Sequence, residues 1–300
     1  MHGEAPDPRI RWDHIDRSGG PTVLRIVLGT QLRKLREAKG ISREEAGEYI
    51  RASHAKISRL ELGRVGLKER DVEDLLTLYG VTDDNERKVF LDLVNQARQP
   101  GWWHRYNDLL PNWFELYLRL EQESSYIRCF DHQTIPGLLQ TEDYARNVIR
   151  FGHGSTTRDE LERRVHLRLN RQKVLTQPGA PRFWAVVDEA ALRRPIGGPE
   201  TMRAQYKHIL NMVEHPNITL QILPFERSGY AVLSGSFTIL RFNHADLPDL
   251  VYIEQLTSSV YHDKRNEVEP YLSHIERITI QALTPTESIK FLQQMIKELE

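Results

Sequence analysis

A cluster of side chains able to contact nucleic acid lies between positions 53 and 59. His54, Lys56 and Arg59 carry nitrogen groups that form hydrogen bonds, and Ala55 lies among them. Lys and Arg side chains can donate to guanine O6 and N7 in the major groove, where a good bidentate contact discriminates between bases by about 1–3 kcal/mol. His54, Ala55, Lys56 and Arg59 are therefore the candidate base-reading residues. Arg59 is the first choice and Lys56 the second.

A second set of polar and basic side chains flanks this cluster and suits the sugar-phosphate backbone. Contacts to phosphates position a protein on DNA but do not read its sequence. The candidate backbone contacts are Ser42, Arg43, Arg51, Ser53, Arg33, Arg36 and Arg64. The alternative for every cation named so far is a solvated surface charge that contacts no ligand.

Two short helices and a tight turn are needed to hold these side chains. Ser42 and Glu45 predict a capping box at the start of the first helix, and Ser53 predicts a cap for the second. Gly63 is typical of the residue that ends such a helix. A helix-turn-helix also needs a small residue where its helices cross, and Gly47 fits that requirement. The apolar residues expected on the inner face of the second helix are Ile57 and Leu60.

This pattern resembles the Cro/lambda-repressor (XRE-type) helix-turn-helix. The resemblance covers residues 32–36, 41–45 and 53–61, and its most specific part is the ending Lys-Ile-Ser-Arg-Leu-Glu-x-Gly at Gly63. It implies a double-stranded DNA partner. It also implies that Ser53 and the base-reading candidates reach base edges or the flanking phosphates.

The same resemblance assigns roles to the supporting helix and exposes one departure. Ser42 and Arg43 resemble first-turn residues that grip the DNA backbone, whereas Glu61 is expected to cap or pair locally. The family usually has Gly in the turn, where this chain has Arg51. A left-handed Arg costs about 1 kcal/mol or more. Either the turn differs, or Arg51 is kept because it reaches a phosphate, and we favour the second explanation.

Length and periodicity predict two domains, since 300 residues is about twice the size of a modest domain. The expected fold is an all-α helix-turn-helix N-terminal domain of five short helices, followed by an α+β or mixed α/β domain. The expected parts are a flexible N-terminal tail at 1–27, the helix-turn-helix domain at 28–98, and a regulatory and dimerisation domain at 100–300. Helices are expected in the second domain near 112–128, 142–151, 157–175, 199–214, 267–282 and 286–299. Strands are expected at 182–187, 218–223, 237–242 and 251–256, with the order in the sheet left open.

The charge distribution is uneven although the total is balanced. Residues 29–70 contain 11 Lys or Arg and 6 Asp or Glu, whereas residues 71–96 contain 2 and 7. A basic block followed by an acidic one indicates a small domain with one positive face. Two oppositely charged solvated surfaces are the alternative.

The C-terminal part has a second resemblance, carried by residues 101–104, 136–146, 188–194, 217–225 and 251–254. These blocks are similar to the carboxyl-terminal domain, of uncharacterised function, in bacterial Cro-type regulators that include antitoxin-like and developmental proteins. The resemblance implies a small partner protein encoded nearby and no enzymatic activity.

Aromatic and basic side chains in this part allow two further interpretations. An aromatic wall could line a ligand or partner pocket, although packing in a core or interface is favoured. The residues of this candidate pocket are Trp102, Trp103, Trp113 and Tyr117. The arginine-rich helix at 157–175 could form a second surface for DNA or an acidic partner, although a solvated amphipathic face is favoured.

Several function classes lack their motifs. The sequence contains no phosphate-binding Gly-Lys loop, dinucleotide fingerprint, nucleophile elbow or His-Glu-x-x-His helix. Cys129 is the only cysteine, which excludes an internal disulfide and any zinc site built from cysteine pairs. No apolar run is long enough for a membrane span, and residues 1–28 lack a signal-peptide core. We therefore expect a cytoplasmic protein that is no enzyme and needs no metal or cofactor.

The leading hypothesis is a sequence-specific DNA-binding transcriptional regulator that acts as a homodimer on a pseudo-palindromic operator. Its C-terminal domain would sense a partner protein or a small ligand. One alternative is an antitoxin-like interaction module that holds a small partner protein and autoregulates. Another is a DNA-targeted enzyme, which would need a pocket with convergent titratable groups within residues 100–300. The operator, the effector and the choice between repression and activation are left open.

Overall fold

The computed structural model describes residues 21–63, 65–97, 101–152, 156–243 and 247–299. The chain divides into two compact units. The first unit comprises residues 1–101 and 244–247, and the second comprises residues 102–243 and 248–300.

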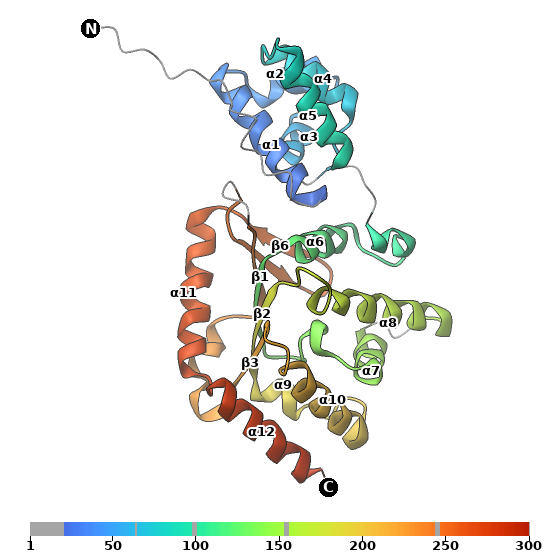
Figure 1. Ribbon diagram of the computed structural model, residues 1–300, viewed down its shortest axis with the longest axis vertical. Coiled ribbons are helices and arrows are strands. Elements are labelled where there is room, and N and C mark those ends of the chain that lie inside the picture. The colour runs from blue at the N-terminus through green and yellow to red at the C-terminus, as the bar shows by residue number, and fades with distance from the viewer. Residues whose placement is uncertain (1–20, 64, 98–100, 153–155, 244–246, 300) are drawn as a thin grey trace, which may run out of the picture. The chain divides into compact units, whose positions relative to one another are not determined.

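The first unit is all-helical, and its five helices agree with the expected number. They are α1 (Pro21–Ala38), α2 (Arg43–Tyr49), α3 (His54–Glu61), α4 (Glu69–Leu78) and α5 (Asp84–Gln96) (Figure 1). The core forms because each helix turns one apolar stripe inward. Its fully buried members include Leu28, Leu32, Ile57, Leu75 and Phe90.

The start of the first helix corrects the expected tail at 1–27. The helix α1 begins at Pro21 instead of Leu28, and Leu24 and Val27 extend its buried stripe towards the N-terminus. Proline is compatible with the first position of a helix because its missing N–H has no partner there anyway. Pro21 is therefore the first residue of a helix and not part of a tail. The rest of the expected tail, residues 1–20, lies outside the described residues.

The second unit is built on a mixed six-stranded sheet. Its strands are β1 (Tyr126–Asp131), β2 (Arg182–Asp188), β3 (Ile218–Leu223), β4 (Phe237–Arg241), β5 (Leu250–Glu254) and β6 (Ser259–His262). They lie in the order β3-β2-β1-β4-β5-β6. β1 pairs in parallel with β2 and antiparallel with β4, so the parallel and antiparallel halves of the sheet meet along this strand.

Helices cover both faces of the sheet. α11 (Arg265–Gln281) lies along one face, and the helices from α6 to α10 lie on the other (Figure 1). The remaining helices are α6 (Asn112–Glu123), α7 (Glu142–Gly152), α8 (Arg158–Gln172), α9 (Glu189–Arg193), α10 (Gly198–Met212) and α12 (Pro285–Glu298). The last of these packs against α10 and β3.

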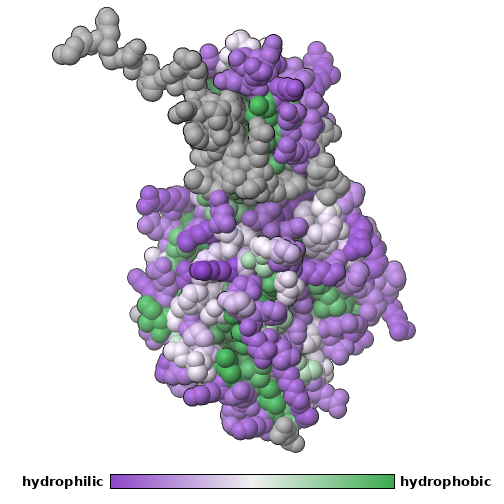
Figure 2. Space-filling view, viewed as in Figure 1, coloured by the Kyte–Doolittle hydropathy of each residue, from purple (hydrophilic) through white to green (hydrophobic). Residues whose placement is uncertain are grey.

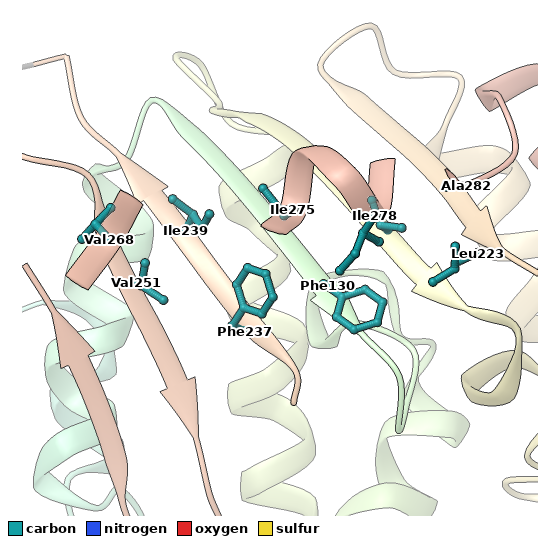
Figure 3. Close-up of a cluster of buried hydrophobic side chains, with 10 residues drawn as sticks. Phe130, Leu223, Phe237, Ile239, Val251, Val268, Ile275, Ile278 and Ala282 are labelled. Carbon is teal, nitrogen blue, oxygen red and sulfur yellow. The ribbon is translucent and has the colours of Figure 1, made fainter. Parts of the chain in front are cut away.

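An apolar core joins the sheet to α11. Phe130 and Phe237 point from neighbouring strands towards Ile275 and Ile278 of the helix (Figure 3). All four side chains are buried. Because side chains alternate between the faces of a strand, Cys129 and Asp131 point to the opposite face from Phe130.

Four of the six strands were expected from their sequence, and two were not. The expected strand at 218–223 has the bounds found for β3, and the strands expected at 182–187, 237–242 and 251–256 correspond to β2, β4 and β5. The central strand β1 was not predicted, and the helix predicted near 112–128 wrongly includes its first three residues, Tyr126 to Arg128. The edge strand β6 was not predicted either. The helix α6 ends at Glu123, and Ser124 adopts an extended conformation.

Hydrophilic residues cover most of the coloured surface in the view of Figure 2, and the apolar areas between them are smaller. None of the helices in the described ranges is both long and apolar enough to span a membrane.

Candidate functional site

The turn between α2 and α3 has the close backbone approach that a helix-turn-helix requires. Gly47 is buried, and a Cβ atom at this position would lie 2.7 Å from the carbonyl oxygen of Ala52. The expectation that a small residue is needed at the crossing is therefore confirmed. Any larger side chain would have to move backbone instead of a flexible neighbour.

Both helices begin at the predicted caps. The Oγ of Ser42 accepts from the N–H of Glu45 at 3.1 Å, and the Glu45 carboxylate accepts from the N–H of Ser42 at 2.7 Å. The Oγ of Ser53 accepts from the N–H of Lys56 at 3.2 Å. These bonds satisfy backbone donors that the helices leave unpaired and thereby fix where α2 and α3 start.

The helix α3 buries one face and exposes the other. Ile57 and Leu60 are buried on the inner face as expected, whereas His54, Ala55 and Arg59 are exposed. The Nε of Arg59 donates to the carbonyl of Ala55 at 3.3 Å, which leaves the other guanidinium nitrogens without a described partner. Three of the four predicted base-reading residues thus share an exposed surface.

The fourth base-reading candidate is engaged by an acidic residue of α4. The Nζ of Lys56 lies 2.6 Å from the Oδ2 of Asp71, and both side chains are partly buried. Lys56 is therefore held on the surface of its own domain. The sequence does not predict this ion pair. Asp71 begins the acidic segment 71–96, and the charge pattern of that segment indicates only a solvated surface.

A buried ion cluster corrects the role expected for Arg36. This side chain is 6% exposed, and its guanidinium donates to both carboxylate oxygens of Glu61, at 2.5 and 3.1 Å. It also donates to the carbonyl of Ile41. Arg36 therefore holds Glu61 at the end of α3 and is not placed to contact a DNA phosphate, because its hydrogen-bond donors are used inside the domain. The local pairing expected for Glu61 is confirmed.

Arg43 lies at the solvent side of the same cluster. Its Nε donates to the Oε2 of Glu61 at 3.0 Å, and 36% of its side chain remains exposed. The buried Glu61 carboxylate thereby orients the Arg43 guanidinium. The remaining guanidinium nitrogens can still reach a ligand.

Arg51 occupies the turn in a left-handed conformation. Its φ angle is +54°, and among the described residues no other non-glycine residue has a positive φ. The backbone strain expected from replacing the usual glycine is thus present, and the side chain is exposed. The turn keeps its left-handed geometry and tolerates the cost.

The two remaining backbone candidates differ in what the structure shows. Arg33 is exposed and forms an i,i+4 pair with Glu37 at 2.8 Å on α1. Arg64 lies outside the described residues.

A second close approach, which the sequence did not predict, occurs at Gly29, where a Cβ atom would lie 2.5 Å from the carbonyl oxygen of Leu60. α1 and α3 therefore approach closely at a glycine.

The four predicted aromatic side chains do not line one common pocket. Trp102 and Trp103 pack edge to face at 5.7 Å, and Trp103 is buried in a small apolar cluster. Phe114 packs against this cluster and contacts both Trp113 and Tyr117. Tyr117 alone of the four lines a cavity of about 640 Å³, and Trp102 lines a smaller one of about 310 Å³. Packing, the favoured interpretation, accounts for most of this group.

A cavity within the second unit has a volume of about 640 Å³. Its walls come from β1, β4 and β5, from the loop that follows β1, and from α8. Its polar and charged lining residues are Asp131, Gln133, Thr134, Gln140, Arg168, Arg171, Ser236, Thr238, Glu254 and Gln255. Two arginines expected on a solvated helix face therefore point into a cavity, which the sequence pattern did not predict.

The two cavity arginines have different partners. The guanidinium of Arg171 donates to both carboxylate oxygens of Glu121, at 2.5 and 2.6 Å, and lies over the ring of Tyr117. Arg168 instead donates to the side-chain oxygen of Gln140 at 2.9 Å. One cation is neutralised by a buried carboxylate, and the other meets only a neutral amide.

Burial also raises the pKa of two ionisable side chains of β1 that line the cavity, Asp131 and Cys129. It raises the pKa of Asp131 to about 6, although Cys129, Ser236 and Arg171 act in the opposite direction. Burial raises the pKa of the Cys129 thiol well above its ordinary value. A thiol in this state is a poor nucleophile at neutral pH, since the thiolate is the reactive form. The described residues contain no group of three or more His, Cys, Asp or Glu side chains able to hold a metal ion.

Comparison with known families divides the chain in a similar way. Residues 27–90 match a family described as a helix-turn-helix domain, and residues 114–294 match a family described as a domain of unknown function (DUF5753). No curated protein and no solved structure matches the chain. The first match supports DNA binding by the first unit.

Proposed function

The chain belongs to the family with the C-terminal domain of unknown function DUF5753, and from this premise and its helix-turn-helix domain we propose that it is a sequence-specific DNA-binding transcriptional regulator. The observation that carries the proposal is the exposed outer face of α3. His54, Ala55 and Arg59 lie together on that face, while the inner face is buried. A recognition helix needs this division to enter the major groove.

The position of the helix start adds to the argument. His54 is the first residue of α3 and follows the Ser53 cap. The amino end of a helix carries a partial positive charge and free N–H groups, both of which favour an approaching phosphate. The helix can therefore anchor its start on the backbone while Arg59, more than one turn further along, reaches a base edge.

Cations around α3 supply the non-specific part of the binding. Arg43 and Arg51 are the phosphate contacts that we propose, since both keep exposed guanidinium nitrogens. Arg36 has no such role, because Glu61 occupies it. Lys56 is proposed to read a base only after it leaves Asp71.

We further propose a Cro-type dimer on a pseudo-palindromic operator, with the second unit providing dimerisation and sensing. A single module of this size buries limited surface on DNA, so two half-sites are expected about 34 Å apart or at a multiple of that distance. A sensing role suits the second unit because it contains a cavity with polar and charged lining residues, in which the Cys129 thiol is buried and protonated.

Selection of bound fragments from random duplex DNA tests the proposal. The parent protein should enrich a site with two related half-sites. Arg59→Ala should relax base preference at one position of each half-site, with a loss of about 1–3 kcal/mol for the preferred base.

Arg43→Ala serves as the comparison, because it should weaken binding to all sequences alike and reduce the slope of log K against log salt by about 1. Lys88→Ala, at an exposed position on α5, controls for the loss of one positive charge. If Arg59→Ala and Arg43→Ala bind the selected site as tightly as the parent, α3 does not dock as proposed.

A further inference from the structure

The cavity of the second unit has the size and position of a small-molecule site. Its volume of about 640 Å³ lies within the range of about 300–1,000 Å³ typical of ligand pockets. It opens on the sheet face opposite α11, because Ile127, Cys129 and Asp131 alternate along β1 with Phe130 of the α11 core. The loop after the carboxyl end of β1 forms part of its wall.

The wall contains a cation that forms no close ion pair. Arg171 is paired with Glu121 and Tyr117, whereas the hydrogen bond from Arg168 goes to Gln140. Within the described part of the chain, no carboxylate forms an ion pair with Arg168. Burial and the neighbouring Arg171 lower the pKa of Arg168 to about 10, and the opposing charge of Glu254 offsets only part of this effect. It remains protonated at neutral pH.

An unpaired guanidinium facing a cavity favours an anionic ligand. Removing a charge from water is costly unless a partner replaces the lost hydration. The planar fork of Arg matches a carboxylate or phosphate through two parallel hydrogen bonds. We propose that this cavity binds a small organic acid whose single anionic group pairs with Arg168.

The other lining groups define the rest of the ligand. Tyr117 and Tyr252 stack at 4.1 Å and offer a flat apolar wall. Asp131 and Glu254 supply negative charge and hydrogen-bond acceptors to the same cavity. Their charge disfavours a second anionic group on the ligand, so the ligand has one acid group and an apolar or aromatic body.

This inference rests on the proposed sensing role of the second unit and identifies the chemical class that is sensed. Four probes of similar shape test it on the full-length protein without DNA. Benzoate and phenyl phosphate carry the anionic group, benzamide is the neutral analogue, and benzylamine is the cation that Asp131 and Glu254 would select instead. Titration calorimetry and thermal unfolding measure binding at millimolar concentrations.

At least one of the two anions should bind and raise the unfolding temperature of the second unit in a dose-dependent way. Arg168→Gln should weaken that binding about tenfold or more. Arg168→Lys keeps the positive charge but lacks the planar guanidinium, so it should bind the anion with intermediate affinity. This variant tests the proposal if Arg168→Gln does not fold. Arg158→Gln, at an exposed position of the same helix, should bind as the parent does.

The comparison between benzoate and phenyl phosphate decides which acid group the site prefers. Preferred binding of benzamide or benzylamine, equal anion binding by the parent and Arg168→Gln, or no binding of either anion overturns the inference. DNA binding is measured on the same preparation. A preparation that binds its selected DNA but neither anion refutes the ligand site alone, whereas loss of DNA selection refutes the proposed function.

Discussion

At the scale of single residues, the ion pair between Lys56 and Asp71 sets a competition. A lysine held at 2.6 Å by a carboxylate must leave that partner before it can donate to a base. Asp71 also brings a negative charge close to the helix that faces DNA. In the free protein, Lys56 is therefore paired with Asp71 and is not available to a base.

We predict that Asp71→Asn increases DNA affinity by up to about fivefold, since a partly exposed pair of this kind is worth up to about 1 kcal/mol. The gain should be larger at low salt. Fluorescence anisotropy with the selected duplex measures it. Asp92→Asn, at an exposed position on α5, removes the same charge without touching Lys56. An equal gain in both variants would mean that net charge alone is responsible.

Arg51 stores backbone strain at the turn. With φ at +54°, replacement by glycine should raise the free energy of unfolding of the first unit by about 0.5–1 kcal/mol. The same Arg51→Gly change should weaken binding to all duplexes alike, because a phosphate contact is lost. Chemical denaturation and anisotropy measure the two effects. A variant that is more stable and binds equally well would remove Arg51 from the interface.

Asp131 makes the stability of the second unit depend on pH. Its pKa of about 6 in the folded protein exceeds the ordinary value of about 4, so the folded state holds this proton to higher pH than the unfolded chain does. The free energy of unfolding therefore falls as pH rises between about 4 and 6. Above pH 6 the folded state bears the full cost of burying the ionised Asp131 carboxylate. The facing groups are Cys129, Ser236, Arg171 and Glu254.

We predict that Asp131→Asn is more stable than the parent at pH 8, by up to about 3 kcal/mol, and nearly equal to it at pH 4. Denaturant unfolding across this range measures the difference. Asp108→Asn should act in the opposite sense, because Arg163 lowers the pKa of Asp108 and that carboxylate stabilises the fold only when ionised. A constant difference between the Asp131 variant and the parent at all pH values would contradict the assignment.

At the scale of elements, two helix crossings in the first unit depend on glycine. At Gly29 an added methyl group would lie 2.5 Å from the Leu60 carbonyl oxygen and 2.7 Å from that of Glu61, both of which belong to the backbone of α3. Neither neighbour can rotate away. The orientation of α3 is thus fixed from α1 as well as from α2.

We predict that Gly29→Ala lowers the free energy of unfolding of the first unit by about 1–3 kcal/mol and weakens DNA binding by displacing α3. Gly66→Ala is the matched control, since nothing lies within 4 Å of the added atom. Circular dichroism and DNA binding measure both variants. If the two variants behave alike, the contact between α1 and α3 is looser than described.

Local signals in the sequence were sufficient for the helix-turn-helix. Caps and glycine requirements act over a few residues, so Ser42, Gly47 and Ser53 could be placed from the sequence alone. The strand β1 could not be placed in this way. Its residues follow a helix almost directly, and the central position of this strand depends on pairing with segments far away in the chain.

The same distinction explains the arginines. Arg36 and Arg168 occur in helices whose charge pattern is typical of solvated surfaces. Their inward placement depends on Glu61 and on the cavity wall, which become neighbours only after folding. Sequence position therefore identified these residue types but assigned them to the wrong surface.

At the scale of the whole molecule, the two units keep separate cores and separate chemistry. The net charge of the chain is −1, yet the segment that holds α2 and α3 is basic. Electrostatic attraction to DNA is therefore local to one unit. In the other unit, buried acids such as Glu121 pair with its own arginines.

The central place of β1 also affects how the protein is made. Its antiparallel partner β4 leaves the ribosome long after β1 itself, because α7 to α10 and two further strands are translated in between. A nascent chain therefore presents one open edge of this apolar strand throughout that interval. Chaperone dependence and misassembly during synthesis should concentrate in the second unit, while the helical first unit, with its local contacts, can fold as soon as it emerges.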